Sequence, residues 1–477
     1  MGDPKGFLKL RRATPVRQTP AQRVTHWNEF YVPLTDAALA EQGARCMDCG
    51  VPFCQSGTGC PVRNVIPEWN ELVRRGRWRD ASVLLHSTNN FPELTGRLCP
   101  APCESACVLS LVDEPVAIRT IEQAIADRAF KEGWLSPEPP RRETGHRVAV
   151  VGSGPAGLAA AQQLRRAGHT VTVFERAKRA GGLLQYGIPD FKLEKHVVER
   201  RMTQLVAEGI AFRTGVDVGT DVSVEELSTA FDAVCLAMGA CMPRELRVPG
   251  RELRGVHLAM DLLRQQNERL FGEDVDPAHE ISARGKHVVI IGGGDTGSDC
   301  AGTCIRQGAK SVTQFELMPQ PPVRRASSTP WPLWPMQLRT SHAHDEGTER
   351  EWNTATTAFS GEGGAVRRLH GVRVDVGVAS NGSTEVIPRA ASEFDIPADL
   401  VVLAMGFQGT EDAPWLRELG VGLKRGVIDT RTTYETQVPG VFAAGDARRG
   451  ASLIVWAIRE GRDAAEEIDQ YLSARVS

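Results

Sequence analysis

The sequence predicts an α/β protein in which a mainly helical, cysteine-rich domain precedes two doubly wound domains, one inserted in the other. Three observations support this prediction. Seven of the 11 cysteines lie between Cys46 and Cys107. A hydrophobic strand, a glycine-rich turn and a helix-like stretch follow one another twice, from Arg147 and from Lys286. Two apolar segments that end in Ala-Met-Gly, at Gly239 and Gly406, flank the second unit and indicate where the chain crosses between the two domains.

The length and net charge of the chain indicate how many domains to expect and which kinds of partner are not expected. A chain of 477 residues suggests about three domains of ~150 residues each. The net charge of −3 gives no reason to expect nucleic acid or a membrane surface as a partner. No apolar run approaches the ~20 residues that span a bilayer. We therefore expect a cytoplasmic protein, in which clustered cysteines are more often metal ligands or catalysts than disulfides.

The first predicted domain covers residues 1–145. Pro67–Gly76 and Ile118–Gly133 have helical patterns, and the proline-rich stretch Ser136–Gly145 is a natural linker. The basic N-terminal stretch is broken by prolines and is interpreted as an extended arm that could dock elsewhere.

The cysteines of this domain fall into two runs with uneven steps: Cys46, Cys49, Cys54 and Cys60, then Cys99, Cys103 and Cys107. Zinc is one alternative, but zinc prefers two pairs of close cysteines. Uneven steps with prolines after Cys60 and Cys99 favour iron–sulfur ligation. Seven cysteines are one short of two sets of four. Either one cluster keeps an open iron, or Glu122 or Gln123 completes it.

The first glycine loop follows the strand that starts at Arg147. Its residues are Gly152, Ser153, Gly154, Pro155, Ala156 and Gly157. Such glycines let the backbone approach a pyrophosphate at a helix N-terminus. The next strand ends at Glu175, 23 residues after Gly152, where a carboxylate can accept a hydrogen bond from a ribose hydroxyl. These features predict dinucleotide binding.

The C-terminal segment Gly440–Asp446 looks like the second flavin motif of flavoproteins with two dinucleotide domains. In those proteins the aspartate, here Asp446 after Gly445, holds the ribityl chain. The pairing with the first loop predicts FAD, with Ser452 in a segment that starts a helix near the flavin ring. Gly182 and Leu183 are expected to contact FAD as well.

The second glycine loop is expected to bind the nicotinamide nucleotide. Its candidate residues are Gly292, Gly294, Asp295, Thr296 and Gly297. Glu316 lies 24 residues after Gly292, in the position of Glu175. A carboxylate there favours a free 2′-hydroxyl over a 2′-phosphate, so NADH is favoured over NADPH. Arg324 and Arg325 could accept the phosphate instead, although we interpret them as solvated loop charges.

No redox cysteine pair is expected beside the flavin, because Gly181–Pro189 contains no cysteine. Cys300 and Cys304 are interpreted as core residues rather than as a dithiol relay. Lys192 lies either near the nicotinamide or on the surface, and we favour the surface. Electrons from the flavin should therefore leave through the cysteine-rich domain.

These motifs together resemble the small (β) subunit of glutamate synthase along essentially the whole chain. The segments that carry the resemblance are Cys46–Cys54, Asn89–Glu93, Cys99–Cys103, Gly152–Gly157, Gly181–Leu193 and Ser452–Gly461. The flavin and pyridine-nucleotide domains of this family are shared with dihydropyrimidine dehydrogenase. The fold implied is two doubly wound dinucleotide-binding domains, one inserted in the other, preceded by a mainly helical iron–sulfur domain.

The resemblance implies two 4Fe–4S clusters with interleaved ligands. One set is Cys46, Cys49, Cys54 and Cys107. The other is Cys60, Cys99, Cys103 and a side-chain oxygen, assigned to Glu122 with Gln123 in reserve. The stretch Gln55–Gly59 is slightly longer than in many relatives, which loosens the assignment of Cys60.

The activity implied is that of an electron-input subunit. It would oxidise NAD(P)H through FAD and pass electrons through the clusters to a large (α) subunit, for L-glutamate synthesis from L-glutamine and 2-oxoglutarate. The predicted boundaries are 1–145 for the iron–sulfur domain, 146–255 with 399–477 for the FAD domain, and 256–398 for the NAD(P)H domain. No catalytic side chain is assigned. The alternatives are a stand-alone NAD(P)H:acceptor oxidoreductase of the ferredoxin type and a redox sensor whose clusters do not turn over.

Overall fold

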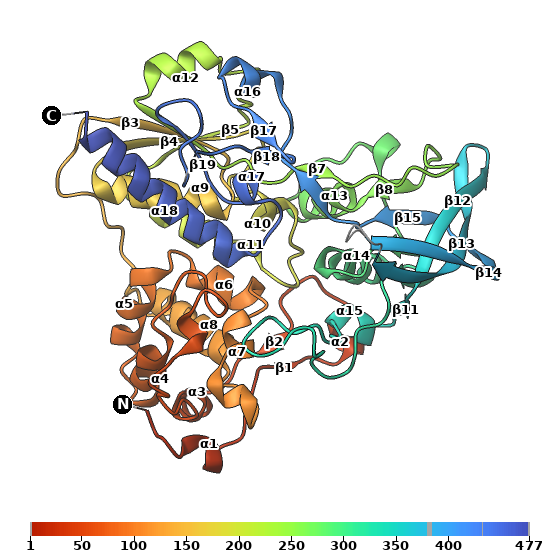
Figure 1. Ribbon diagram of the computed structural model, residues 1–477, viewed down its shortest axis with the longest axis horizontal. Coiled ribbons are helices and arrows are strands. Elements are labelled where there is room, and N and C mark those ends of the chain that lie inside the picture. Colours follow the sequence, from red (N-terminus) through yellow and green to blue (C-terminus); the bar gives the residue numbers. More distant parts are fainter. Residues whose placement is uncertain (1, 379–383, 432, 476–477) are drawn as a thin grey trace.

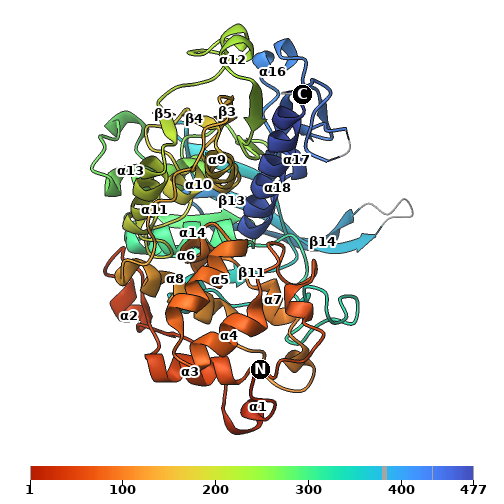
Figure 2. The ribbon, with the colours of Figure 1, turned by 90° about the vertical axis from the view of Figure 1, so that its left-hand side faces the viewer.

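The computed structural model describes residues 2–378, 384–431 and 433–475. Figures 1 and 2 show a helical N-terminal part, red to orange, on one side of two α/β parts. Within the described residues no helix is both long and apolar enough to cross a membrane.

The N-terminal part is built from short helices around one core. α4 (Ile66–Arg74) is an example of how these helices form the core. Its apolar residues Ile66, Trp69 and Val73 recur at helical spacing, and each is at most 1% exposed. The sequence predicted α4 and α8 (Ile118–Lys131), and both are confirmed. The other elements are α1 (Gly6–Lys9), β1 (Val16–Arg17), α2 (Pro20–Arg23), β2 (Tyr31–Val32), α3 (Asp36–Ala44), η1 (Phe53–Gln55), α5 (Trp78–Thr88), α6 (Pro92–Leu98), α7 (Pro102–Ser105) and η2 (Val108–Leu111).

The first α/β part contains a parallel sheet in the order β19-β6-β3-β4-β5. Its strands are β3 (Arg147–Val151), β4 (Thr170–Glu175), β5 (Ala211–Thr214), β6 (Ala233–Leu236) and β19 (Val441–Ala443). The accompanying helices are α9 (Pro155–Ala167), α10 (Leu183–Tyr186), α11 (Lys195–Ala207), α12 (Val224–Ala230), α16 (Pro414–Glu418), α17 (Asp446–Arg449) and α18 (Ile454–Ser473), beside the small pair β17 (Leu423–Lys424) and β18 (Val427–Ile428). α18 packs so closely on α9 that a Cβ at Gly461 would lie 2.2 Å from the Ala156 carbonyl oxygen.

The second α/β part contains a parallel sheet in the order β11-β10-β9-β15-β8. Its elements are β8 (Val256–Leu258), α13 (Ala259–Leu270), η3 (Pro277–His279), β9 (His287–Ile291), α14 (Asp295–Arg306), β10 (Ser311–Phe315), α15 (His342–Asp345), β11 (Glu349–Glu351) and β15 (Leu400–Leu403). All of these strands lie between β6 and β19 in sequence, so the predicted insertion of one doubly wound unit in the other is confirmed.

The two chain crossings between these parts lie side by side. β7 (Met242–Pro243) leaves the first sheet and pairs antiparallel with β16 (Phe407–Gly409), which returns from the second. Both strands come directly after the Ala-Met-Gly segments.

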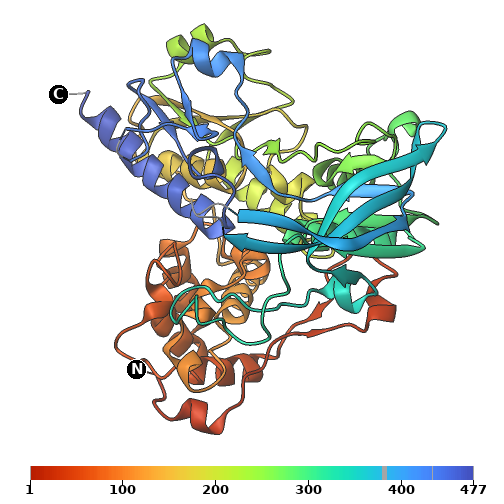
Figure 3. The same ribbon diagram turned by 45° about the vertical axis from the view of Figure 1, so that its right-hand side comes forward.

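A third, antiparallel sheet extends from the inserted part and was not anticipated from the sequence. It consists of β12 (Thr354–Glu362), β13 (Ala365–Val378) and β14 (Thr384–Pro397) (Figure 3).

The segment Pro319–Gly364 has no clear sequence period, and its first half contacts the N-terminal part. Trp331 packs against Phe53 of the N-terminal part, with ring centroids 4.7 Å apart and the ring planes tilted by 57°. Arg325 donates hydrogen bonds to the carbonyl oxygens of Thr329 and Leu333 in its own loop and to that of Ser105 in the N-terminal part. The segment therefore docks on the cysteine-rich part instead of standing free in solvent.

The N-terminal arm, which contains Arg23 and Phe30, also contacts the inserted part. Arg23 and Arg306 both pair with Glu346, at 2.5 and 2.7 Å, and the three side chains are 3%, 1% and 0% exposed. Phe30 packs between these groups and Phe191, with ring centroids 6.3 Å from the latter.

Candidate functional site

The seven clustered cysteines converge inside the N-terminal part. Cys54 lies in η1 and Cys103 in α7, and the other five lie in the connections between helices. Cys46 and Cys49 are half-buried, whereas Cys54, Cys60, Cys99, Cys103 and Cys107 are each less than 9% exposed. No disulfide joins them.

The electrostatic neighbours of the thiols divide them into two sets. Burial raises the pKa of the Cys54 thiol, and the next contributions come from Cys107, Cys46 and Cys49, with Cys60 the weakest. Burial likewise raises the pKa of the Cys103 thiol, with Cys60 and Cys99 as the nearest thiols and Glu122 also contributing. Each set gathers groups that repel one another as thiolates, which is expected where a cation or a cationic cluster core compensates the charge.

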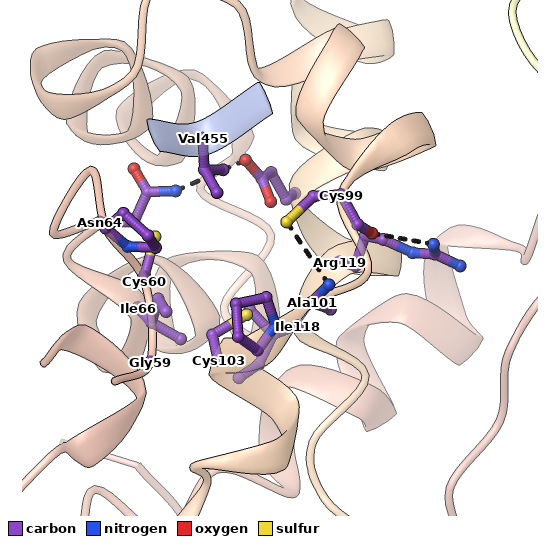
Figure 4. Close-up of a pocket in the computed structure, with 13 residues that line it drawn as sticks. Gly59, Cys60, Asn64, Ile66, Cys99, Ala101, Cys103, Ile118, Arg119 and Val455 are labelled. Atoms are coloured by element: carbon purple, nitrogen blue, oxygen red, sulfur yellow. Dashed lines mark hydrogen bonds between the residues drawn. The ribbon is translucent and has the colours of Figure 1, made fainter. Parts of the chain in front are cut away.

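The second set lines a pocket of about 310 Å³ (Figure 4). Cys60, Cys99 and Cys103 contribute thiols to it, and Glu122 lines it from α8. Gln123, the other candidate, lines a different cavity. Val455, in the first turn of α18, closes the pocket from the first α/β part. Among the described residues no group of three His, Cys, Asp or Glu side chains is arranged to hold a single metal ion.

The backbone groups around the buried thiols can stabilise thiolates that bind an iron–sulfur cluster. The pKa of the Cys60 thiol is raised to about 12 by burial and by Glu122, while backbone N–H groups of Asn64, Val62 and Arg63 lower it. The Ala101 N–H donates to Cys99 Sγ at 3.4 Å. N–H···S hydrogen bonds of this kind stabilise thiolate ligands of iron–sulfur clusters.

Glu122 is 5% exposed and hydrogen-bonded. Its Oε1 accepts hydrogen bonds from Thr95 Oγ1 at 2.6 Å and from Asn89 Nδ2 at 3.0 Å. Burial raises the pKa of Glu122 to about 7, and these hydrogen bonds oppose the rise. Sequence reasoning gave no role to Thr95 or Asn89, although Asn89 begins one of the segments that carried the resemblance.

The first glycine loop has the geometry of a pyrophosphate cradle. Gly152 has φ +100°, and a Cβ on it would lie 2.5 Å from the Ala237 carbonyl oxygen. A Cβ on Gly157 would lie 2.0 Å from the Gly152 carbonyl oxygen. Both positions therefore require glycine, and α9, which starts at Pro155 and includes Gly157, has its N-terminus at the loop.

Glu175 is the last residue of β4 and lies beside this loop. Its carboxylate accepts hydrogen bonds from the backbone N–H groups of Ser153 at 3.2 Å and Ala177 at 2.8 Å. A pocket of about 590 Å³ opens beside it, lined also by Cys241 and Trp415.

The remaining candidate flavin residues come to the same place from distant parts of the chain. A Cβ on Gly182 would lie 3.1 Å from Gly154 Cα, which brings Gly182 and the adjoining Leu183 to the loop. A Cβ on Gly445 would lie 2.6 Å from Ala156 Cβ. The next residue, Asp446, accepts hydrogen bonds from the Ser452 N–H at 3.1 Å and its hydroxyl at 2.8 Å.

The second glycine loop repeats the geometry of the first. Gly292 has φ +126°, and a Cβ there would lie 2.2 Å from the Ala404 carbonyl oxygen. Glu316 Oε2 accepts a hydrogen bond from the Gly293 N–H at 2.9 Å, as Glu175 does from Ser153. α14 starts at Asp295 and includes Thr296 and Gly297.

The structure also bears on the interpretations of Cys300, Cys304 and Lys192. Cys300 and Cys304 are fully buried, as expected of core residues. The interpretation of Lys192 as a surface lysine is wrong. Its Nζ lies 2.8 Å from Asp299 Oδ1, and the two side chains are 25% and 5% exposed, so the lysine joins the Gly181–Leu193 segment to α14.

Two family models match the chain. One, described as pyridine nucleotide-disulphide oxidoreductase, matches residues 146–461. The other, described as dihydropyrimidine dehydrogenase domain II, 4Fe-4S cluster, matches residues 23–134, which contain all seven clustered cysteines.

Named relatives match nearly the whole chain. The glutamate synthase (NADPH) small chain of Mycobacterium tuberculosis (strain CDC 1551 / Oshkosh) is 56% identical over 99% of this chain and 96% of that protein. The glutamate synthase (NADH) of Schizosaccharomyces pombe is 48% identical over 98% of this chain, which corresponds to 22% of that longer protein. Among solved structures, FprA from Mycobacterium tuberculosis in complex with NADPH shares the fold, with a TM-score of 0.55 and 20% identity over 69% of this chain and 85% of that one.

Proposed function

Because the chain belongs to the family of glutamate synthase small chains, a family of flavin and iron–sulfur oxidoreductases, we propose that it is the electron-input subunit of a glutamate synthase. The observation that carries the proposal is the position of Val455. This residue lies in the first turn of the helix that follows the candidate flavin motif, and it also lines the pocket of Cys60, Cys99 and Cys103. The flavin and the nearer cluster would therefore lie on either side of this turn.

The residues of the first glycine loop would bind the FAD pyrophosphate. Glu175 would accept hydrogen bonds from the ribose, and Asp446 would hold the ribityl chain with Ser452 fixing its carboxylate. When bound, FAD accepts a hydride from NAD(P)H and releases electrons one at a time. The loop from Gly292 to Gly297 would hold the nicotinamide nucleotide.

Glu316 supports NADH as the donor. Its carboxylate lies at the end of β10, where a 2′-phosphate would meet a negative charge. Arg325 is engaged with three carbonyl oxygens, which leaves it poorly placed to bind a phosphate. The relatives differ in their names, NADPH for the bacterial chain and NADH for the yeast protein.

The cysteine-rich part would hold two 4Fe–4S clusters. Cys46, Cys49, Cys54 and Cys107 would hold the one nearer the surface, and Cys60, Cys99, Cys103 and Glu122 the one nearer the flavin. The partial exposure of Cys46 and Cys49 supports the outer set as the point where electrons would leave the protein.

The acceptor would be a large subunit that makes L-glutamate from L-glutamine and 2-oxoglutarate, in the cytoplasm. The yeast relative supports this, because the counterpart of this chain is 22% of a longer polypeptide there. The runner-up is a stand-alone NAD(P)H:acceptor oxidoreductase of the ferredoxin type.

The test is NADH-driven glutamate formation with the anaerobically purified chain, alone and with its candidate large subunit. We expect NADH to bleach the flavin in both samples and glutamate to form only in the mixture. A Cys103→Ser variant should still be bleached but should form no glutamate. Bleaching without glutamate in the wild-type mixture would favour the stand-alone reductase, and absence of bleaching would contradict both.

A further inference from the structure

The carboxylate of Glu122 is held asymmetrically. Its Oε1 accepts three hydrogen bonds, from Thr95 Oγ1 at 2.6 Å, Asn89 Nδ2 at 3.0 Å and Asn64 Nδ2 at 3.4 Å. In the part of the chain that the structure describes, no side chain or backbone group donates to Oε2. One oxygen is thus fully engaged, and the other is available to the pocket that Cys60, Cys99 and Cys103 line.

The two amide donors cannot exchange their oxygen and nitrogen ends without losing other contacts. Asn89 Oδ1 accepts a hydrogen bond from the Phe91 N–H at 3.0 Å. Asn64 Oδ1 accepts one from Thr88 Oγ1 at 2.7 Å. Each amide must therefore present its NH₂ group to Glu122.

The hydroxyl donor is fixed in the same sense. Thr95 Oγ1 accepts a hydrogen bond from Asn89 Nδ2 at 2.8 Å. Its own hydrogen has Glu122 Oε1 as the nearest acceptor, at 2.6 Å, whereas the Phe91 and Pro92 carbonyl oxygens are both 3.4 Å away. All three donor residues are buried, and an unmatched donor there would be costly.

This arrangement specifies a side chain with two acceptor oxygens. A glutamine at position 122 has a single oxygen. If that oxygen met the three donors, the NH₂ group would face the thiols and could not ligate a metal. If it faced the thiols, the NH₂ group would meet three donors.

We propose that Asn64, Asn89 and Thr95 are positioning residues that clamp Oε1 of Glu122, so that Oε2 alone is presented as the fourth ligand of the inner cluster. The proposal rests on the cluster assignment made under the proposed function. It predicts that a carboxylate at position 122 is required and that an amide does not replace it.

The test compares Glu122→Gln and Thr95→Val with Thr120→Val, a control on the same helix as Glu122 whose threonine lines a different cavity. Each variant is purified anaerobically, and iron per flavin and the EPR spectra of oxidised and dithionite-reduced samples are measured. Bound flavin per chain reports that the protein has folded. We expect a 3Fe–4S signal in oxidised Glu122→Gln and Thr95→Val, with the loss of one iron per chain, and the wild-type spectrum in Thr120→Val.

Two outcomes would contradict the inference in different ways. Wild-type iron content and spectra in Glu122→Gln would show that the carboxylate is not required and would overturn the clamp. Cys103→Ser separates this failure from failure of the cluster assignment. If that variant also keeps the wild-type spectra, the inner cluster is not bound where we propose. If Thr95→Val does not retain flavin, the isosteric Glu122→Gln decides alone.

Discussion

At the scale of single residues, His86 occupies a place where only a neutral imidazole fits. Its Nδ1 lies 2.8 Å from the Ser82 carbonyl oxygen and so carries the hydrogen, which leaves Nε2 to accept from Arg201 Nη2 at 3.4 Å. Burial, followed by the Arg201 charge, lowers the pKa of His86 to about 4. Protonation would set two positive groups against each other.

We expect the free energy of unfolding to depend on pH through His86. The unfolded chain binds a proton near pH 6.5, whereas the folded protein resists it down to about pH 4. The contribution is therefore complete above pH 6.5 and is lost as the pH falls toward 4, by at most about 3 kcal/mol. Urea unfolding at several pH values should show this slope, reduced in His86→Gln. His279→Gln, at an 82% exposed side chain, is the control and should leave the slope unchanged.

Glu316 should set the choice between nicotinamide nucleotides. In Glu316→Ala we expect the ratio of kcat/KM for NADH to that for NADPH to fall about tenfold, because a charge-assisted hydrogen bond to the ribose is lost and the repulsion of a 2′-phosphate disappears. Flavin reduction measured by stopped flow with each donor gives the ratio. Arg324→Ala is the matched control, and a ratio that changes there but not in Glu316→Ala would assign specificity to the arginine.

At the scale of elements, the N-terminal arm is attached to α14 and α15 through a buried charge cluster. Two guanidinium groups, of Arg23 and Arg306, share the single carboxylate of Glu346. Buried ions cost several kcal/mol each to desolvate, and only their mutual attraction compensates.

Removing that carboxylate should therefore be severe. We expect Glu346→Gln to lower the free energy of unfolding by about 3–5 kcal/mol, since two buried cations lose their counter-ion. The neighbouring Asp345 pairs with Arg17 and Arg23 but is 43% exposed, so Asp345→Asn should cost less than about 1 kcal/mol. Equal losses in the two variants, measured by chemical denaturation, would show that the buried cluster has no special weight.

Elements with a local pattern could be predicted from the sequence, and elements defined by distant contacts could not. The glycine loops and the carboxylates Glu175 and Glu316 follow from short motifs whose spacing is set by one strand, turn and helix. The docking of Trp331 on Phe53 depends on residues 278 positions apart in a segment without periodicity. Lys192 was misjudged for the same reason, because its partner Asp299 belongs to the other α/β part.

The candidate cluster site was predictable only in part. The cysteines can be recognised in the sequence by their spacing. The donors around Glu122 come from three different helices or turns, and none of them is a residue type that commonly binds metals. Nothing in the sequence distinguishes these donors from other polar residues. Only the fold buries Asn64, Asn89 and Thr95 beside one carboxylate.

At the scale of the whole molecule, the N-terminal part is joined to the first α/β part by more than its linker. Arg201 of α11 pairs with Glu93 of α6 at 2.7 Å, and both side chains are at most 2% exposed. Asn90 donates to Gln162 at 2.8 Å across the same seam.

We expect these contacts to hold the two parts together after the linker is cut. A protease site placed within residues 136–145 should yield two fragments that still elute together in size-exclusion chromatography. Arg201→Met leaves Glu93 buried without its cation and should separate the fragments. Separation of the cut wild-type chain would show that the linker, and not the seam, maintains the assembly.

The paired crossings β7 and β16 have a consequence for how this architecture can be altered. Because the chain leaves at Met242–Pro243 and returns at Phe407–Gly409 in two paired strands, the inserted part has its entry and exit side by side. The inserted part could therefore be replaced by another domain whose two ends lie as close together as two paired strands. Such a replacement would leave the first sheet undisturbed, because its strands β6 and β19 would stay adjacent.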